Sequence, residues 1–317
     1  MRTALLLTLS LSFIALNAQV DTGKVKKDTI PRAVSDTPGL KGDTSSMIDE
    51  LGGADVEPDY VQNTFKATRI INSHSTEMLG KHNLDYRICH RFDPLNTGAY
   101  NLWGLDKAYQ RMSFTYGFTD FINVEIGRSS VNKVYDASAK FKLMRQAKGD
   151  KMRFMTVVYV ANMAIQTLKN TNTQYEPYYF TNRLYYTHQL LMARKITKSF
   201  SLQLMPTIVH RNFVDSAKYK NTVFSIGIGG RNKVSRKCAI TYEYFYVLPN
   251  QIKPVYKNSF SLGFDIETGG HVFQLNLTNS IGMNEKGFIA ETTDNWLKGG
   301  IHFGFNISRV FYIGRRR

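Results

Sequence analysis

The sequence of 317 residues has no apolar run long enough for a membrane-spanning helix after its first residues. One long uncharged stretch, Phe154 to Leu168, includes Asn162 and Gln166, whereas a spanning helix needs about twenty mostly apolar residues. We therefore expect no inner-membrane helix.

Cysteine is also scarce, with only Cys89 and Cys238 available for a disulfide. The alternation of side chains puts Cys89 on a polar face beside Arg87 and Arg91, whereas Cys238 shares a face with Ile240. Side chains on opposite faces of a sheet cannot reach the short distance that a disulfide requires. Both thiols are therefore expected to be free.

Signatures of cofactor chemistry are absent as well. No glycine-rich phosphate loop follows a strand, no histidine or cysteine spacing resembles a metal site, and no repeat of fixed length occurs. We expect no cofactor, no metal ion and no nucleic-acid partner.

The first residues carry an export signal. Arg2 precedes a short apolar run and the small residue Ala18, which is the pattern of a secretory signal peptide over residues 1–18 with cleavage near Ala18. Residues 19–62 are rich in Asp, Thr, Ser, Gly, Pro and Lys and have no periodicity, which predicts a disordered leader before a barrel domain over 63–317.

From residue 63 onward, segments that alternate apolar and polar residues are separated by turn-forming or charged clusters. A period of two predicts β-strands. We expect strands at 83–92, 109–118, 121–130, 135–145, 152–165, 182–194, 199–210, 222–231, 237–248, 258–267, 271–279 and 300–312.

The alternation also assigns the two faces of each strand. Met112, Phe114 and Tyr116 alternate with small or polar residues, and most other segments repeat this phase, whereas 152–165 is apolar on both sides. A soluble β-sandwich or lipocalin-like barrel also alternates, but export, strand length and aromatic residues at strand ends favour a membrane. The predicted fold class is all-β, a transmembrane antiparallel β-barrel of about twelve strands in a Gram-negative outer membrane.

Three runs carry a family resemblance: Phe65 to His74, Leu84 to Phe92, and Gly304 to Phe311. They resemble the outer-membrane β-barrel proteins of domain of unknown function family 5777. The resemblance covers Asn63 to Phe311, implies the same fold and location, and supplies no catalytic or binding residue. Segment 63–81 fits a lumen plug, a periplasmic hairpin or an additional strand.

The connections between the expected strands differ in length. Short turns lie in the periplasm in such barrels, so the longer connections, among them 93–108 and 280–299, are expected outside the cell. These two connections flank the strands that must pair to close the barrel, and they carry Trp103 and Trp296. Each tryptophan either anchors its own loop by packing or contacts a partner or ligand at the mouth.

The lumen-facing phase collects polar side chains in which acids and bases are balanced. The candidates are Asp85, Arg87, Arg91, Arg111, Glu125, Arg183, Glu243, Asp265, Gln274, Asn276, His302 and Asn306. A balanced interior is typical of a salt network that fills a narrow barrel, whereas a strongly charge-selective porin should show an excess of one sign. A conducting lumen is the alternative.

The net charge of +16 is concentrated on the turns expected in the periplasm. This basic rim comprises Lys151, Arg153, Lys195, Lys198, Arg236, Lys237, Arg315, Arg316 and Arg317. Such a rim attracts the headgroups of outer-membrane lipid or an acidic periplasmic partner, by analogy with polybasic segments. The alternative is a solvated rim that aids solubility during export.

Three functions fit these features: a narrow channel for small solutes, a non-conducting membrane anchor or scaffold for envelope partners, and an outer-membrane lipid hydrolase. A hydrolase requires a nucleophile beside a base. His90 and His188 are expected on the lipid-facing side, but no serine or cysteine can be placed next to either one. We therefore predict no catalytic residue and no enzyme, and we take the channel as the leading prediction with the anchor as its alternative.

Overall fold

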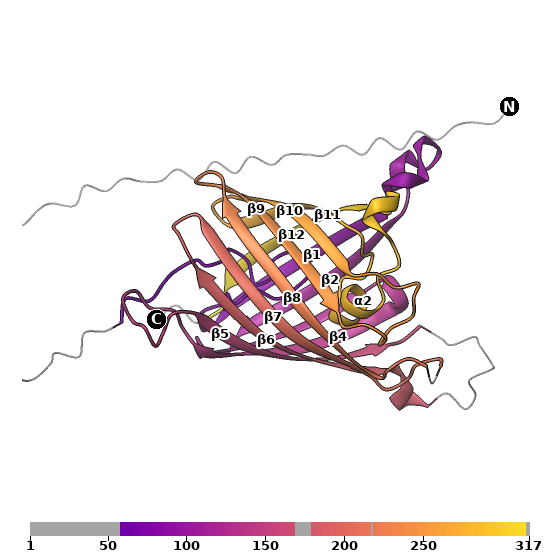
Figure 1. The fold of residues 1–317 in the computed structure, drawn as a ribbon. Helices are drawn as coiled ribbons and strands as arrows, with labels where there is room; N and C mark the ends of the chain where they lie inside the picture. The colour runs from indigo at the N-terminus through magenta and orange to yellow at the C-terminus, as the bar shows by residue number, and fades with distance from the viewer. Residues whose placement is uncertain (1–57, 169–178, 217, 315–317) are drawn as a thin grey trace, which may run out of the picture. The chain divides into compact units, whose positions relative to one another are not determined.

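Twelve β-strands form a closed antiparallel barrel in the computed structural model, which describes residues 58–168, 179–216 and 218–314 (Figure 1). The strands are β1 (Asn83–Pro94), β2 (Ala108–Gly117), β3 (Ile122–Ser129), β4 (Val134–Met144), β5 (Thr156–Gln166), β6 (Leu184–Lys195), β7 (Phe200–Arg211), β8 (Thr222–Lys233), β9 (Cys238–Val247), β10 (Ser259–Glu267), β11 (His271–Thr278) and β12 (His302–Tyr312). Each strand pairs with its sequence neighbours, and β1 pairs with β12 to close the barrel. The predicted fold class is confirmed.

Successive side chains of each strand point alternately out of and into the barrel, because the backbone of a strand is pleated. On β2, Arg111 and Ser113 are buried on the inside, whereas Phe114 is 46% exposed on the outside. Leu262 on β10 and its cross-strand partner Leu277 on β11 lie on the outer face in the same way. The outer surface is therefore an apolar belt.

The connections divide between the two ends of the barrel. The long-loop end carries the connections 95–107, 130–133, 167–183 (partly outside the described residues), 212–221, 248–258 and 279–301. It also holds the short helices η1 (Leu95–Thr97), η2 (Ala99–Gly104), η3 (Val131–Lys133), η5 (Phe180–Arg183), α2 (Glu285–Ala290) and η6 (Trp296–Lys298). The short-turn end carries 118–121, 145–155, 196–199, 234–237, 268–270 and the residues that lead into β1.

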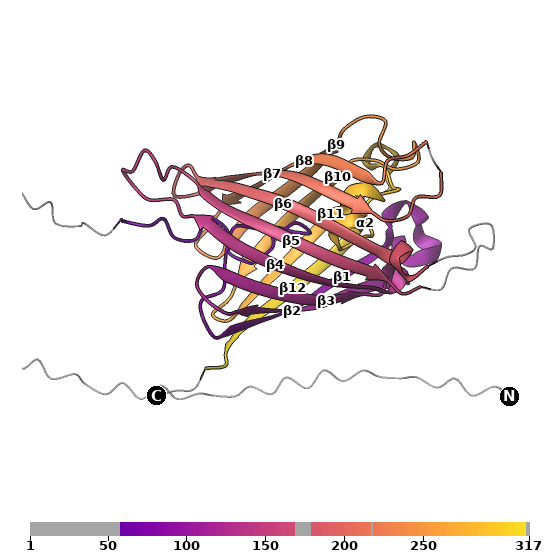
Figure 2. The same cartoon turned by 90° about the horizontal axis from the view of Figure 1, so that it is seen from below.

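Two segments enter the lumen from these opposite ends. The lumen hairpin, residues 64–76, precedes β1 and is buried except for Lys66. The connection 279–301 folds α2 into the barrel at the long-loop end, away from the turn between β4 and β5 (Figures 1 and 2). Of segment 63–81, residues 64–76 lie inside the barrel and belong to none of the twelve strands.

One side of the lumen is apolar, which differs from the polar lumen that strand alternation predicts. Inward residues of β5 to β9, such as Val158, Leu191 and Met205, form one cluster with Phe65 and Ile70 of the lumen hairpin. The inner wall can be apolar there because the hairpin, and not water, covers it.

The predicted signal peptide and the leader up to residue 57 lie outside the described residues, as do Arg315 to Arg317. Residues 58–62, the last five of the predicted leader, are described and contact the β4–β5 turn. In the described part of the chain, no helix is long and apolar enough to cross a membrane. Cys89 and Cys238 are both free, as predicted.

Candidate functional site in the lumen

The lumen hairpin reverses direction at residues 70–73. The amide of Ile70 donates to the carbonyl of Ser73 over 2.9 Å, and the amide of Ser75 donates to the carbonyl of Thr68 over 3.0 Å. Two backbone hydrogen bonds are few for a hairpin, and isolated hairpins are marginal in water. Its position therefore depends on the barrel wall.

Glu243 of β9 binds the tip of this turn. Its carboxylate accepts hydrogen bonds from the amides of Asn72 (2.9 Å) and Ser73 (3.1 Å) and from Ser73 Oγ (2.7 Å). Hydrogen bonds to an ionised group are roughly twice as strong as neutral ones. Glu243 therefore satisfies the donors that the turn leaves without backbone partners.

Four further strands bind the same tip, among them β12, from which Asn306 donates to the carbonyl of Ile71 over 3.2 Å. Arg91 of β1 donates to Asn72 Oδ1 over 2.7 Å, and Asn72 Nδ2 donates to Ser261 of β10 over 3.1 Å. Gln274 of β11 donates to the carbonyl of Ile70 over 2.6 Å. The tip is thus fixed by side chains from one continuous sector of the wall.

The two arms of the hairpin are bound on other sides of the barrel. Lys140 of β4 donates from Nζ to the carbonyls of Thr68 (2.7 Å) and Ser75 (2.9 Å). Gln203 of β7 donates to the carbonyl of His74 over 2.7 Å. These contacts replace the strand partners that the hairpin lacks.

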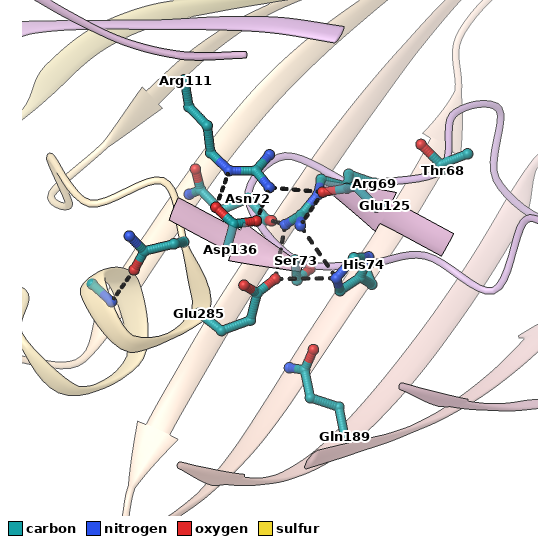
Figure 3. Close-up of polar contacts among 12 residues, drawn as sticks. Thr68, Arg69, Asn72, Ser73, His74, Arg111, Glu125, Asp136, Gln189 and Glu285 are labelled. Atoms are coloured by element: carbon teal, nitrogen blue, oxygen red, sulfur yellow. Dashed lines mark hydrogen bonds and ion pairs between the residues drawn. The ribbon is translucent and has the colours of Figure 1, made fainter. Parts of the chain in front are cut away.

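A buried ion network joins the hairpin to the wall and to α2 (Figure 3). Arg69 lies 2.8 Å from Glu125 of β3 and 2.9 Å from Glu285 at the start of α2. Arg111 of β2 pairs with the same Glu125 at 2.7 Å and also with Asp136 of β4. Because an unpaired buried charge is strongly destabilising, each member depends on the others.

The hairpin and α2 shift each other's ionisation. Burial and the charge of Arg69 lower the pKa of His74 to about 4, so His74 is neutral at pH 7. Burial opposes ionisation of Glu285, but Arg69 and His74 lower its pKa below the ordinary value. Against the effect of burial, Glu125 and Glu285 raise the pKa of Arg69. The hairpin therefore brings one permanent positive charge to two carboxylates.

Two glycines of the wall leave space for the tip. A Cβ at Gly229 of β8 would lie 2.5 Å from Ile70 Cδ1, and a Cβ at Gly263 of β10 would lie 3.0 Å from Ile71 Cδ1. Glycine lets a neighbouring segment approach a strand closely. The inner wall is therefore shaped around the lumen hairpin.

The helix α2 occupies the lumen from the other end. Asn284 caps it by accepting from the amide of Gly287 over 2.8 Å. Phe288 packs edge-on against Phe245 of β9 with ring centroids 5.1 Å apart, and it belongs to the apolar cluster that contains Phe65. The hairpin and α2 thus share both an ion network and an apolar cluster.

All the predicted lumen residues except Arg183 are buried among the inward-facing positions of the barrel. They are Asp85, Arg87, Arg91, Arg111, Glu125, Glu243, Asp265, Gln274, Asn276, His302 and Asn306. Arg183 lies instead in η5 at the long-loop end, because β6 begins at Leu184 rather than at residue 182.

The two tryptophan loops meet at the β1–β12 seam. The amide of Leu95 donates to the carbonyl of Ile301 over 2.8 Å. Trp296 Nε1 donates to the carbonyl of Phe260 over 2.8 Å, and the rings of these two residues pack with centroids 5.0 Å apart. Trp103 is 54% exposed. Trp296 therefore packs against Phe260 on the outward-facing side of β10, and Trp103 is the more exposed of the two.

The predicted basic rim divides into separate groups. Lys151, Lys195 and Lys198 line one cavity at the short-turn end, and Arg153 lies on the same turn as Lys151. Arg236 and Lys237 are exposed on the neighbouring turn 234–237. Three of the predicted rim bases are thus brought together at one cavity.

Both histidines considered for hydrolysis contact aromatic residues. His90 stacks on Phe305 with ring centroids 4.7 Å apart, and His188 shares a 2.7 Å hydrogen bond with the Tyr159 hydroxyl. Within residues 58–168, 179–216 and 218–314, no group of three or more His, Cys, Asp or Glu is placed to hold a metal ion. Neither contact places a serine or a cysteine beside the histidine.

Sequence reasoning did not place Arg69, His74 and Glu285 together. Glu285 lies in a connection without strand periodicity, and 216 positions separate it from Arg69. For the first two residues a signal existed, because the run Phe65 to His74 carries part of the family resemblance. For Glu285 the sequence offers none.

Residues 65–311 match the family model of the membrane-bound beta barrel domain DUF5777. The chain belongs to this family. No curated protein matches it.

Solved structures also resemble the chain at low sequence identity. The chain is similar to NanC porin (TM-score 0.44, 9% identity, 72% of this chain and 98% of that one) and to KdgM porin (0.42, 8%, 73% and 99%). It is also similar to the Acinetobacter baumannii outer membrane protein Omp33 (0.40, 7%, 73% and 99%).

Proposed function

We propose that this member of the DUF5777 family of membrane-bound β-barrels is an outer-membrane channel for small solutes whose narrow lumen is closed at rest by a removable plug. The plug consists of the lumen hairpin and α2. The observation that carries the proposal is their contact inside the barrel, where Arg69 and Glu285, entering from opposite ends, lie 2.9 Å apart.

The architecture supports an outer-membrane location. Bacterial single-chain barrels of that membrane have an even number of antiparallel strands, short periplasmic turns and longer external loops. The chain has this arrangement, with an apolar outer belt. The short-turn end is accordingly the periplasmic end.

Burial of the hairpin supports a closed resting state. Phe65, Ile70 and Ile71 are each at most 2% exposed. Burying such side chains contributes about 1.5–3 kcal/mol each, so the three together contribute about 5 kcal/mol or more.

The space inside the barrel wall supports a channel that the plug fills. The barrel closes through β1 and β12 without any strand from the hairpin. Small eight-stranded barrels fill their interior with wall side chains, and wider barrels leave an aqueous pore. Here the wall carries Gly229 and Gly263 where the hairpin lies, so the wall alone leaves that space open.

A non-conducting anchor is the second candidate, and one observation favours it. The apolar cluster includes the hairpin residues Phe65, Ile70 and Ile71, α2 and the wall, which gives the interior a core of its own. In that case the plug would stay in place throughout the life of the protein.

Solute efflux from liposomes separates the two candidates. Protein with residues 64–76 and 285–290 replaced by Gly-Ser linkers should release small sugars and amino acids and retain large dextrans, whereas the unaltered protein should release neither. Heat-modifiable mobility on a detergent gel verifies that the variant barrel is folded. A folded variant that retains every solute would favour the anchor.

A further inference from the structure

The short-turn end contains a cavity of about 930 Å³ beside the point where the chain enters the lumen. Three segments line it: the strap, residues 59–62, which precedes the lumen hairpin; the β4–β5 turn; and the β6–β7 turn. We call it the rim cavity. Its volume is within the range of ligand-binding clefts.

Cations of the β4–β5 turn hold the strap in place. The ring of Tyr60 lies between Arg145, 4.7 Å from the ring centroid, and Arg153, which also donates to the Tyr60 hydroxyl over 3.1 Å. Lys148 pairs with Asp59 at 2.7 Å. The strap is thus attached by the same kind of residue that surrounds the cavity.

The lining of the rim cavity is strongly basic. It includes Lys148, Lys151, Arg194, Lys195 and Lys198. The acids of the lining are Asp59 and Asp150, and both are already paired, with Lys148 and Arg153 respectively. The cavity therefore has an excess of positive charge that its own acids do not neutralise.

Apolar side chains lie among these bases. Phe154 and Ile196 line the cavity and are 43% and 50% exposed. A ligand that offers carboxylates and apolar groups in alternation along an extended backbone would contact both kinds of residue. The strap itself binds the β4–β5 turn through its backbone, because Val61 donates from its amide to the carbonyl of Gln146 over 2.9 Å.

We propose that the rim cavity binds an acidic, partly apolar segment of a periplasmic protein, and that this binding detaches the strap and so loosens the plug. The second half rests on the proposed function. Lys195 Nζ, which donates to the carbonyl of Gln62 over 2.8 Å, both lines the cavity and holds the strap. The strap continues through Asn63, in left-handed conformation at φ 53°, directly into the buried hairpin. A carboxylate of the ligand that pairs with Lys148 or Lys195 replaces the bond from that lysine to the strap. The exposed end of the plug then loses a contact that fixes it.

Binding is tested with a fluorescein-labelled octapeptide of alternating Glu and Leu added to the detergent-solubilised protein. The test variant carries Lys151→Gln and Lys198→Gln, two cavity bases without a strap contact. The control variant carries Arg236→Gln and Lys237→Gln, which makes the same charge change on the neighbouring turn. The test variant should bind about tenfold more weakly, the control should bind like the unaltered protein, and binding should weaken with added salt.

Several outcomes would overturn the binding site. Equal losses in both variants would mean that only the general charge of the rim attracts the peptide. A peptide of alternating Lys and Leu that binds as tightly would remove the electrostatic basis. Binding of anionic phosphatidylglycerol vesicles that shows the same dependence on Lys151 and Lys198, without peptide binding, would assign the cavity to lipid headgroups.

Release of the strap is tested separately by efflux from liposomes. Acidic peptide on the side of the short turns should raise small-solute efflux through the unaltered protein at least severalfold and through the Lys151→Gln/Lys198→Gln variant much less. Binding without any change in efflux would overturn strap release. If the barrel without its plug also fails to conduct, the proposed channel function is wrong, whereas the result of the binding test still stands.

Discussion

Arg69, on a hairpin that enters the barrel from the short-turn end, and Glu285, on a helix that enters from the long-loop end, form a buried ion pair of 2.9 Å inside the lumen. The contact joins two segments that lie 216 positions apart in the chain. Closure of the lumen thus depends on side chains that can be altered one at a time.

Arg69→Gln should loosen the plug. The change leaves Glu125 and Glu285 without one cation each, and breaking a buried ion network of this kind costs about 3–5 kcal/mol. Protease cleavage within residues 64–76 and small-solute efflux should both increase. Lys66→Gln is the matched control, because the Lys66 side chain is 39% exposed, pairs with Glu267 at 3.3 Å and should contribute at most about 1 kcal/mol. Equal effects of the two variants would contradict the role of the network.

Glu243→Gln should release the tip of the hairpin. The amide side chain can retain one acceptor but loses the charge that strengthens the bonds from Asn72 and Ser73, and the expected loss is about 2–4 kcal/mol. Hydrogen exchange of these two amides should become faster. Glu291→Gln serves as the control, because it makes the same chemical change at the long-loop end, where this carboxylate pairs with Lys286 at 2.9 Å. Exchange that is unchanged in Glu243→Gln would exclude the carboxylate as the anchor of the tip.

Gly263→Val should push the hairpin out of position. Already a Cβ at this residue would lie 2.5 Å from Thr241 Oγ1 and 3.0 Å from Ile71 Cδ1, and such overpacking costs about 1–3 kcal/mol. The variant should keep its heat-modifiable mobility but show increased cleavage of the hairpin. Gly270→Val is the control. Gly270 lies in the turn between β10 and β11, a Cβ there has open space around it, and the hairpin should stay protected. If the hairpin of Gly263→Val resists cleavage as it does in the unaltered protein, the tip does not depend on the space that Gly263 leaves.

Acidification should weaken docking of the plug through His74. In the docked hairpin the pKa of His74 is lowered to about 4 by burial and by Arg69, against an ordinary value of 6.5. A released hairpin therefore binds a proton between these two values and a docked one does not. Docking should be at full strength above pH 6.5 and lose up to about 3 kcal/mol as the pH falls to 4. The lowered pKa of Glu285 adds a loss only below its ordinary value of 4.5.

Efflux measured from pH 7.5 to 4.5 checks this dependence. The unaltered protein should release small solutes faster toward the acidic end, and His74→Gln, which removes the imidazole from the hairpin, should show a smaller rise over the same range. A profile that is unchanged by His74→Gln would assign any pH dependence to another group.

The sequence was sufficient for the barrel because its strands carry a local signal. Met112, Phe114 and Tyr116 alternate with inward residues over a few positions, and this period predicted all twelve strands with small errors at their ends. The largest consequence of such an error is Arg183, which lies in η5 rather than on β6.

The plug could not be predicted in the same way, because its contacts are non-local. Glu243 binds residues 170 and 171 positions away, and Arg69 binds Glu285 across 216 positions. Pairings at this distance leave no periodic pattern in one sequence. Two hints were present, namely the balanced charges of the inner face and the doubly apolar segment 152–165, and both become intelligible once the hairpin covers the wall.

Single-channel recording in planar bilayers tests whether the lumen hairpin and α2 close a channel. The unaltered protein should insert and remain silent, whereas protein with both the lumen hairpin and residues 285–290 replaced by Gly-Ser linkers should give uniform ohmic steps typical of a narrow pore. Both preparations must show the folded, heat-modifiable band. Steady conductance by the unaltered protein, or silence of the folded variant without its plug, would contradict a channel closed by the hairpin and α2.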